Sequence, residues 1–426
     1  MDIAILFIVF VGLMLLGLPV SYCMLFCSIP YLLMNGIDLS IAVTRMASGP
    51  DSFPILAVPF FILAARLMNS AGITERIFTW CNKIVGHIHG GLGYANILAS
   101  IIFAGMSGTA IADAGGLGAI ELQAMKDQGY DEEFALAITG ASSVVGPIIP
   151  PSLPAVVLGC VASVSVGKIF IGGLLPGVVI GLALAAMTYY YSQKRNYPRN
   201  PRSTIREFLH ASRRAFFPLL CPVIIIGGIL AGALTPTEAA IVAVVYSLIL
   251  GVIYKEVTWK SFKANMLETM DAMLGVIFIV CAANVFAWVL ATAQIPSLVV
   301  SLFDTYVSQA WIAFLLINVL LLVVGTFMET VAAITILTPV LLPVARSYGM
   351  NDVHFAIVMI LNLMIGLMTP PVGEVLYVLS SVSKVPFERI AKAVLPYLIV
   401  LIIALLILTF TPFLVTALPT LVFGVC

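Results

Sequence analysis

The sequence contains little charge. Only 9% of its 426 residues are Asp, Glu, Lys or Arg, whereas about a quarter is usual in soluble proteins. Hydrophobic residues make up 62% and the formal net charge is zero, which excludes a soluble globular domain and gives no sign of a nucleic-acid-binding surface. Apolar stretches of 18 or more residues recur instead, and each is long enough to cross about 30 Å of hydrocarbon as a helix.

Several signatures of chemistry are also absent. The seven cysteines are scattered without the spacing of a metal site, and we interpret them as small apolar packing residues. No glycine-rich Lys-Ser/Thr phosphate loop occurs, which argues against ATP use. No Ser/His pair or metal cluster lies in an apolar segment, so we expect neither an enzyme nor a cofactor beyond a coupling ion. Met1 and Asp2 precede the first apolar run without a basic region or cleavage site, which predicts a spanning helix and not a removed signal.

The positions of the basic residues predict how the chain is oriented in the membrane. A consistent path through the membrane places 17 of the 20 Lys and Arg on one side. The densest group lies in "QKRNYPRNPRSTIREFLHASRR", between the two halves of the chain, and Arg66, Arg76 and Lys83 are assigned to the same side. The positive-inside rule makes this side cytoplasmic. We therefore expect a multi-pass membrane protein with both termini on the side opposite the cytoplasm.

Two proline-rich interruptions stand out in this apolar background. "GPIIPPS" and "GLMTPPV" each place a glycine four residues before a Pro-Pro pair, and the pairs begin at Pro150 and Pro370, 220 positions apart. Gly105 in "FAGMSGTA" and Gly325 in "VVGTFMETV" have the same separation, and each begins a polar tip between two apolar arms. Two motifs with one offset predict an internal repeat.

The two halves are predicted to be inverted relative to each other, because five crossings in the first half make the second half start from the opposite side. The predicted fold is an all-α polytopic membrane protein with an inverted repeat, two re-entrant hairpins and two broken helices. The boundaries are 1–192 for the first repeat (scaffold helices 3–34, hairpin 93–125, broken helix 134–164), 193–215 for a basic cytoplasmic linker, and 216–426 for the second repeat (scaffold helices 216–254, hairpin 312–345, broken helix 355–381). Further helices are expected near 53–71, 168–192, 265–294 and 393–416, with a horizontal amphipathic arm at 74–85.

The interruptions predict binding sites for ions and for an acid. A proline inside a helix removes a backbone donor at a cost of about 3 kcal/mol, and the freed carbonyls cannot be satisfied by lipid. Such carbonyls suit an alkali cation, and the amide ends of the following half-helix favour a carboxylate. A proline kink that only shapes packing, or a passive scaffold left by gene duplication, is the alternative.

Charged residues inside apolar segments are further candidates. Glu329 lies in a hairpin tip and is predicted either to shape the ion or substrate site or to make structural hydrogen bonds; the same alternatives hold for Asp113. Glu374 follows the second interruption by three residues. Glu238 follows "TPT" at a helix start, which favours compensation of the helix dipole, and Asp271 is interpreted as a tie between scaffold helices.

Together these motifs resemble the large membrane subunit of the tripartite ATP-independent periplasmic (TRAP) transporters. The resemblance covers nearly the whole chain and is carried by "IFAGMSGTAIADAGGLG", "GYDEEFALAITGASSVVGPIIPPS", "GALTPTEAA" and "GLMTPPVGEVLYV". It implies a sodium-driven symporter of organic acids with the ion-transporter fold, in which hairpins and broken helices move as an elevator against a scaffold. It also implies a separate four-helix membrane subunit and a periplasmic substrate-binding protein as partners.

The resemblance further implies site residues. Sodium ligands are expected among Gly105, Ser107, Gly108, Thr109, Ser142, Ser143, Gly146, Pro150, Gly325, Thr326, Met328, Glu329, Thr330, Gly366, Met368 and Thr369. Substrate contacts are expected from Ser107, Ser152, Thr369, Pro151 and Pro371. Family substrates include C4-dicarboxylates and sialic acids, and the amino-acid sequence of the first hairpin is closest to that of the sialic acid members. Lipid is expected beside the basic linker.

Three other functions remain as alternatives. A stand-alone sodium–carboxylate symporter would share this architecture without a binding protein. A membrane-embedded enzyme would need a convergent catalytic set, and a channel would show no stoichiometric coupling.

Overall fold

The computed structural model describes residues 2–51 and 53–424, with the side chains of residues 2–4, 53 and 105–107 outside the description. No strand occurs in these ranges. Among the described residues, seven helices are long and apolar enough to cross a membrane; an eighth span results if Pro54–Ser70 and Ile73–Val85, bent by 69°, count as one. This confirms the predicted all-helical, multi-span architecture.

The first half of the chain forms eleven of the α-helices that the structure describes. They are α1 (Asp2–Leu15), α2 (Val20–Met34), α3 (Ser40–Ser48), α4 (Ala57–Ser70), α5 (Ile73–Val85), α6 (Gly91–Ser107), α7 (Ala110–Ala112), α8 (Gly118–Asp127), α9 (Glu132–Ser143), α10 (Leu153–Ala162) and α11 (Val166–Arg195). A 3-10 turn, Phe53–Leu56, leads into α4, and a π-helical turn, Asp113–Leu117, joins α7 to α8.

The second half continues with ten further helices. They are α12 (Ile205–Leu230), α13 (Pro236–Ile253), α14 (Trp259–Thr292), α15 (Ile295–Tyr306), α16 (Ala310–Phe327), α17 (Thr330–Ser347), α18 (Asp352–Gly366), α19 (Glu374–Ser383), α20 (Phe387–Phe410) and α21 (Phe413–Phe423). Glu238 has the role expected at a helix start, because it forms a capping box with Thr235: the Thr235 amide donates to its carboxylate at 2.7 Å, and its own amide donates to the Thr235 hydroxyl at 3.3 Å.

Several helices begin or end at other residues than the sequence predicts. The irregular connection between the halves is shorter than 193–215, because α12 begins at Ile205, where the Thr204 hydroxyl accepts a hydrogen bond from the Glu207 amide. The helices α3 and α15 were not expected, the helix placed at 265–294 already begins at Trp259, and the last predicted helix is divided into α20 and α21. An amphipathic helix is present at the arm predicted at 74–85, as α5.

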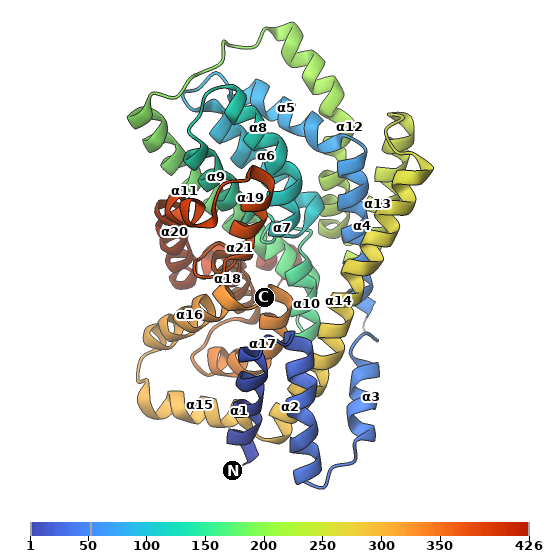
Figure 1. Cartoon of the computed structure of the whole chain (residues 1–426), viewed down its shortest axis with the longest axis vertical. Helices are drawn as coiled ribbons and strands as arrows, with labels where there is room; N and C mark the ends of the chain where they lie inside the picture. Colours follow the sequence, from blue (N-terminus) through green and yellow to red (C-terminus); the bar gives the residue numbers. More distant parts are fainter. Residues whose placement is uncertain (1, 52, 425–426) are drawn as a thin grey trace.

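Both predicted helix interruptions are present and lie at the centre of the molecule. The segment 144–152 separates α9 from α10, and the segment 367–373 separates α18 from α19. Every residue from 134 to 159 and from 353 to 368 is buried, as expected for helices that are apolar on all sides. Figure 1 shows these elements between an upper end formed by α5, α8 and the start of α12 and a lower end formed by α1–α3 and α15.

The hairpin α16–α17 is held to α18 by two glycines. A Cβ added to Gly366 would lie 2.5 Å from the carbonyl carbon of Gly325 and 2.8 Å from its oxygen, closer than real Cβ atoms approach. A Cβ on Gly325 would in turn lie 3.3 Å from the Cα of Gly366. Small residues at this crossing let two backbones touch directly, which fixes the second hairpin tip against the second interruption.

Candidate functional site

The first hairpin tip touches the first proline interruption through backbone atoms. Gly108, with φ of 64°, ends α6, and its carbonyl accepts a hydrogen bond of 3.2 Å from the Leu153 amide at the start of α10. A side chain here would be strained by the positive φ and would place a Cβ 3.0 Å from the Pro151 carbonyl oxygen. The predicted pairing of tip and interruption is therefore found in the first half.

The second tip places a carboxylate and a hydroxyl beside the second interruption. The Glu329 carboxylate accepts a hydrogen bond of 3.1 Å from the Ala332 amide and so caps α17. The neighbouring Thr330 hydroxyl is buried and has no hydrogen-bond partner among the described residues. Glu329 thus makes the structural hydrogen bond that was one of its two expected roles, while Thr330 keeps an unused oxygen.

Both tips and both interruptions border one cavity of about 500 Å³. Most of its wall is apolar, and its polar lining contains one basic and two acidic side chains. Three predicted site residues line it, Thr109, Glu329 and Thr330, together with Arg66, Asn69, Pro147 and Glu374. A largely apolar cavity with a few polar groups is typical of a site for a small molecule.

Three oxygen atoms from different segments surround Gly146. A Cβ placed on Gly146 would lie 3.2 Å from the Ser143 carbonyl oxygen, 3.7 Å from the Asp113 carboxylate Oδ2 and 3.9 Å from the Thr109 carbonyl oxygen. Asp113 is 2% exposed, and neither of its carboxylate oxygens accepts a full hydrogen bond in the described structure, although the Ser100 hydroxyl lies nearby. A buried carboxylate without compensation is costly, so this arrangement favours a cation.

A buried network of polar side chains holds α9 to α6 and α8, next to the first interruption. Asn96 on α6 donates to the Glu121 carboxylate at 2.7 Å and to the Thr139 hydroxyl at 2.8 Å. The Ser142 hydroxyl donates to the Asn96 side-chain oxygen at 2.6 Å. The network joins α6, α8 and α9 and uses the Ser142 hydroxyl as a donor, so that its oxygen faces Asn96. Sequence reasoning missed Asn96 and Glu121, which are isolated polar residues in "GLGYANILAS" and "GAIELQAM".

Other predicted site residues take part in local hydrogen bonds or in packing. The Ser152 hydroxyl caps α10, accepting from the Ala155 amide at 3.2 Å and donating to the Pro147 carbonyl. The Ser143 and Thr369 hydroxyls donate to carbonyls one turn earlier, at 2.8 and 2.7 Å. Residues that do not line the cavity are Gly108, Ser142, Ser143, Gly146, Pro150, Pro151, Ser152, Gly325, Thr326, Met328, Gly366, Met368, Thr369 and Pro371. Gly105 and Ser107 belong to a segment of which the structure describes only the helical backbone.

Arg66 is the basic side chain that lines the cavity. Arg66, which the sequence groups with the cytoplasmic cluster, lies within α4 and lines the cavity together with residues of both tips. Its guanidinium forms an ion pair with Glu268 of α14, 202 positions later. The charge of Arg66 is therefore held at the cavity by a partner that no local sequence pattern indicates.

Comparison with known proteins gives a consistent result over the whole chain. Residues 7–414 match the family model described as the tripartite ATP-independent periplasmic transporter, DctM component. The chain is 44% identical over 415 residues to the sialic acid TRAP transporter large permease protein SiaM of Vibrio cholerae, covering 97% of each protein. It is 37% identical over 398 residues to the C4-dicarboxylate TRAP transporter large permease protein DctM of Pseudomonas aeruginosa, covering 90% of this chain and 93% of that protein.

A solved structure shares the fold at low sequence identity. The YdaH transporter of Alcanivorax borkumensis aligns with a TM-score of 0.61 and 14% identity, over 87% of this chain and 88% of that one. At this identity the likeness shows the fold alone.

Proposed function

This chain belongs to the DctM component family of the tripartite ATP-independent periplasmic transporters, and we propose that it imports an organic acid together with sodium. It is a multi-pass membrane transporter of the TRAP large permease type, as the resemblance implied. One observation carries the proposed mechanism: both hairpin tips and both helix interruptions border a single cavity that contains acidic and basic side chains.

The first sodium site is proposed at Gly146. The oxygens of Ser143, Asp113 and Thr109 that surround it come from α9, the π-helical turn and the first tip. The three prolines at 147, 150 and 151 remove backbone donors from the same buried segment. The Ser143 and Thr109 carbonyls each accept one backbone hydrogen bond of 3.2 Å, from the Gly146 and Asp113 amides, and we propose that their second lone pairs face the ion. The further ligands proposed from the family resemblance are Gly105, Ser107, Gly108, Ser142, Gly146 and Pro150.

The second sodium site is proposed between the second tip and the second interruption. The unpartnered, buried Thr330 hydroxyl and the Glu329 carboxylate at the cavity support it. The contact of Gly325 with Gly366 holds the two segments in register. The other ligands proposed are Thr326, Met328, Met368 and Thr369.

The solute is proposed to lie in the cavity between the two sodium sites. Its carboxylate is proposed to lie at the two interruptions, which reach the cavity through Pro147 and Leu367. The contacts implied by the family resemblance are Ser107, Ser152, Thr369, Pro151 and Pro371, and the last four do not line the cavity in this structure. Arg66 supplies a positive charge to the cavity wall. Sialic acid is the favoured solute, because the 44% identical relative carries that name and the C4-dicarboxylate relative is 37% identical.

The two halves are proposed to be an inverted repeat that works as an elevator. Each half has a helix pair, a hairpin and an interrupted helix in the same order, and the glycine and Pro-Pro motifs are separated by 220 positions in both cases. The proposed mobile part contains residues 93–164 and 312–381, including the hairpin α16–α17, whose 18-residue arms are each about 27 Å long. Arms of this length nearly match the bilayer core, so the re-entrant path that we propose for this hairpin does not follow from the length of its arms.

Membership of the family implies a small membrane subunit and a periplasmic binding protein as partners. We place the complex in the bacterial inner membrane, with the basic end in the cytoplasm and both termini in the periplasm.

Arg66→Gln is expected to raise the half-saturating solute concentration about fivefold with a smaller change in maximal rate, because it removes the positive charge of the cavity wall. Glu268→Gln serves as the matched variant. It leaves Arg66 in place without its ion-pair partner, so solute affinity should be unchanged or higher. Equal losses in both variants would show that the ion pair acts only in holding α4 to α14.

Reconstituted transport tests the proposed function. The chain, its small membrane subunit and its binding protein are incorporated into proteoliposomes, and uptake is measured for sialic acid, C4-dicarboxylates and neutral sugars. We expect uptake of an organic acid only when all three proteins are present. Equal uptake by the chain alone would favour a stand-alone symporter, and uptake of neutral sugars at the same rate would contradict an acid-selective site.

A further inference from the structure

A second cavity lies at the end of the molecule formed by α5 and α12 and shares no lining residue with the cavity of the transport site. The two helices pack side by side there and leave a groove of about 570 Å³ between them, a volume within the usual range for a small ligand. Its charged lining consists of Glu75, Arg76, Lys83, Arg206, Glu207, Arg214 and Glu256, with His210 between the arginines of α12. None of its lining residues lies in the hairpin tips or in the helix interruptions.

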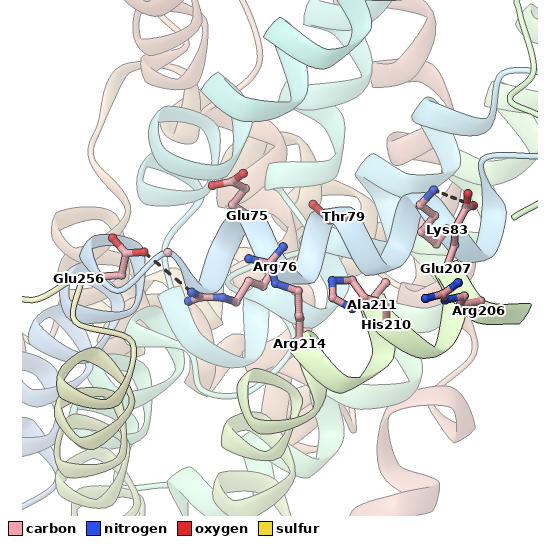
Figure 2. Close-up of a pocket in the computed structure, with 11 residues that line it drawn as sticks. Glu75, Arg76, Thr79, Lys83, Arg206, Glu207, His210, Ala211, Arg214 and Glu256 are labelled. Atoms are coloured by element: carbon pink, nitrogen blue, oxygen red, sulfur yellow. Dashed lines mark hydrogen bonds and ion pairs between the residues drawn. The ribbon is translucent and has the colours of Figure 1, made fainter. Parts of the chain in front are cut away.

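The groove holds arginines that the protein itself does not neutralise. Two of its three acids are engaged, Glu256 with Arg76 at 3.9 Å and Glu207 with Lys83 at 3.3 Å. Neither Arg206 nor Arg214 has an ion pair or side-chain hydrogen bond among the described residues, and Glu75 is the one acid left. Figure 2 shows Arg214 of α12 extending toward Arg76 of α5, whose guanidinium turns to Glu256, while Arg206 lies at the other end of the groove beside Glu207. Like charges in this position favour an anion between them.

One of these arginines is already fixed in place. The guanidinium of Arg76 donates to the Ala71 carbonyl at 2.9 Å and lies 3.8 Å from the centre of the Tyr254 ring. A guanidinium presents a rigid fork of donors that matches phosphate, and little side-chain entropy is lost when it is held beforehand. The groove therefore offers a prepared donor on α5 and two free arginines on α12.

The groove opens toward the apolar part of α12. Arg206, His210 and Arg214 follow one another at intervals of four residues, and Phe217 lies one turn further along the same face with 52% of its surface exposed. Beyond it α12 is apolar enough to span a membrane. A ligand with a phosphate in the groove and hydrocarbon chains along Phe217 would contact both parts, whereas free phosphate would contact only the cations.

We propose that the groove between α5 and α12 binds the phosphate of an acidic phospholipid headgroup from the cytoplasmic leaflet. The phosphate lies at Arg214 and Arg76, Arg206 adds positive charge two turns earlier on α12, and the acyl chains follow α12 into the bilayer. The bound lipid joins the horizontal arm α5 to α12 across the chain. Basic pockets at the cytoplasmic ends of membrane helices bind acidic headgroups in this way.

The full chain is purified in detergent and titrated with short-chain phosphatidylglycerol, short-chain phosphatidylcholine or inorganic phosphate, and bound molecules are counted by native mass spectrometry. Wild type should bind phosphatidylglycerol more tightly than either other probe, and less tightly at high salt. Arg206→Gln and Arg214→Gln should each weaken this binding about fivefold, and together about 25-fold. Arg213→Gln is the matched control, because Arg213 is adjacent on α12 and does not line the groove; it should bind like wild type.

Several outcomes would overturn the proposal. Unchanged phosphatidylglycerol binding in the double variant would remove the groove as its site, as would equal binding of phosphatidylcholine by wild type. Inorganic phosphate bound as tightly as the lipid would assign the groove to a soluble anion. Displacement of the lipid on addition of the small membrane subunit would assign it to that protein. If a variant fails to fold, the probe preference and salt dependence of wild type still decide the outcome.

Discussion

Gly366→Ala is expected to reduce uptake at least about tenfold and to lower the melting temperature of the protein. The new methyl group would meet the Gly325 backbone at 2.5 to 2.8 Å, and backbone atoms cannot move aside as the end of a flexible side chain can. Overpacking of this kind usually costs about 1–3 kcal/mol. Separation of α16 from α18 would also move Glu329 and Thr330 away from the second interruption, so transport should suffer more than stability alone explains.

Gly227→Ala is the matched control for this prediction. Gly227 also lies inside an apolar helix, α12, but a Cβ added there meets nothing within 4 Å. Alanine has the higher helix propensity, so the control should transport normally and melt at the same or a higher temperature. Normal uptake by Gly366→Ala in the same assay would show that the close contact is not needed for transport.

Asp113→Asn is expected to raise the sodium concentration for half-maximal uptake at least about tenfold, a loss of about 1.4 kcal/mol in sodium binding. The substitution keeps the shape of the side chain but removes its charge beside the Ser143 and Thr109 carbonyls. The variant should melt at the same or a higher temperature without sodium, because it no longer buries an uncompensated charge. The stabilisation that sodium gives to the wild type should be reduced.

Asp271→Asn provides the comparison for this substitution. Asp271 is exposed on α14, and no hydrogen bond or ion pair of its side chain is described, so the interpretation as a tie between scaffold helices has no support from a contact. Its substitution should leave the sodium dependence of uptake unchanged. An equal shift in both variants would indicate a general effect of membrane-region charge, and no shift in Asp113→Asn would remove Asp113 from the first site.

The helix interruptions and hairpin tips could be predicted from the sequence because their signals are local. Pro150, Pro151, Pro370 and Pro371 cannot donate backbone hydrogen bonds, and this holds whatever surrounds them. The position of α12 was also available from its sequence, because Thr204 and Glu207 have the spacing of a capping box. That signal was overlooked within a segment of high charge.

The supporting parts of the site could not be predicted in the same way. The ion pair of Arg66 with Glu268 and the bonds of Asn96 to Glu121 and Thr139 join residues that are far apart in the chain. Each partner alone resembles an ordinary polar residue near the end of an apolar helix, and only packing of the helices decides which of them meet. The tertiary structure was likewise required to see that the Ser152 hydroxyl is used within its own helix cap.

The most direct test of two sodium sites at the helix interruptions is the sodium dependence of uptake in proteoliposomes that contain all three proteins. Sodium is replaced stepwise by potassium at constant ionic strength while organic acid uptake is measured. We predict that uptake rises cooperatively with sodium concentration and falls to background in potassium alone. Uptake that continues unchanged without sodium would contradict the assignment of both interruptions as coupling-ion sites.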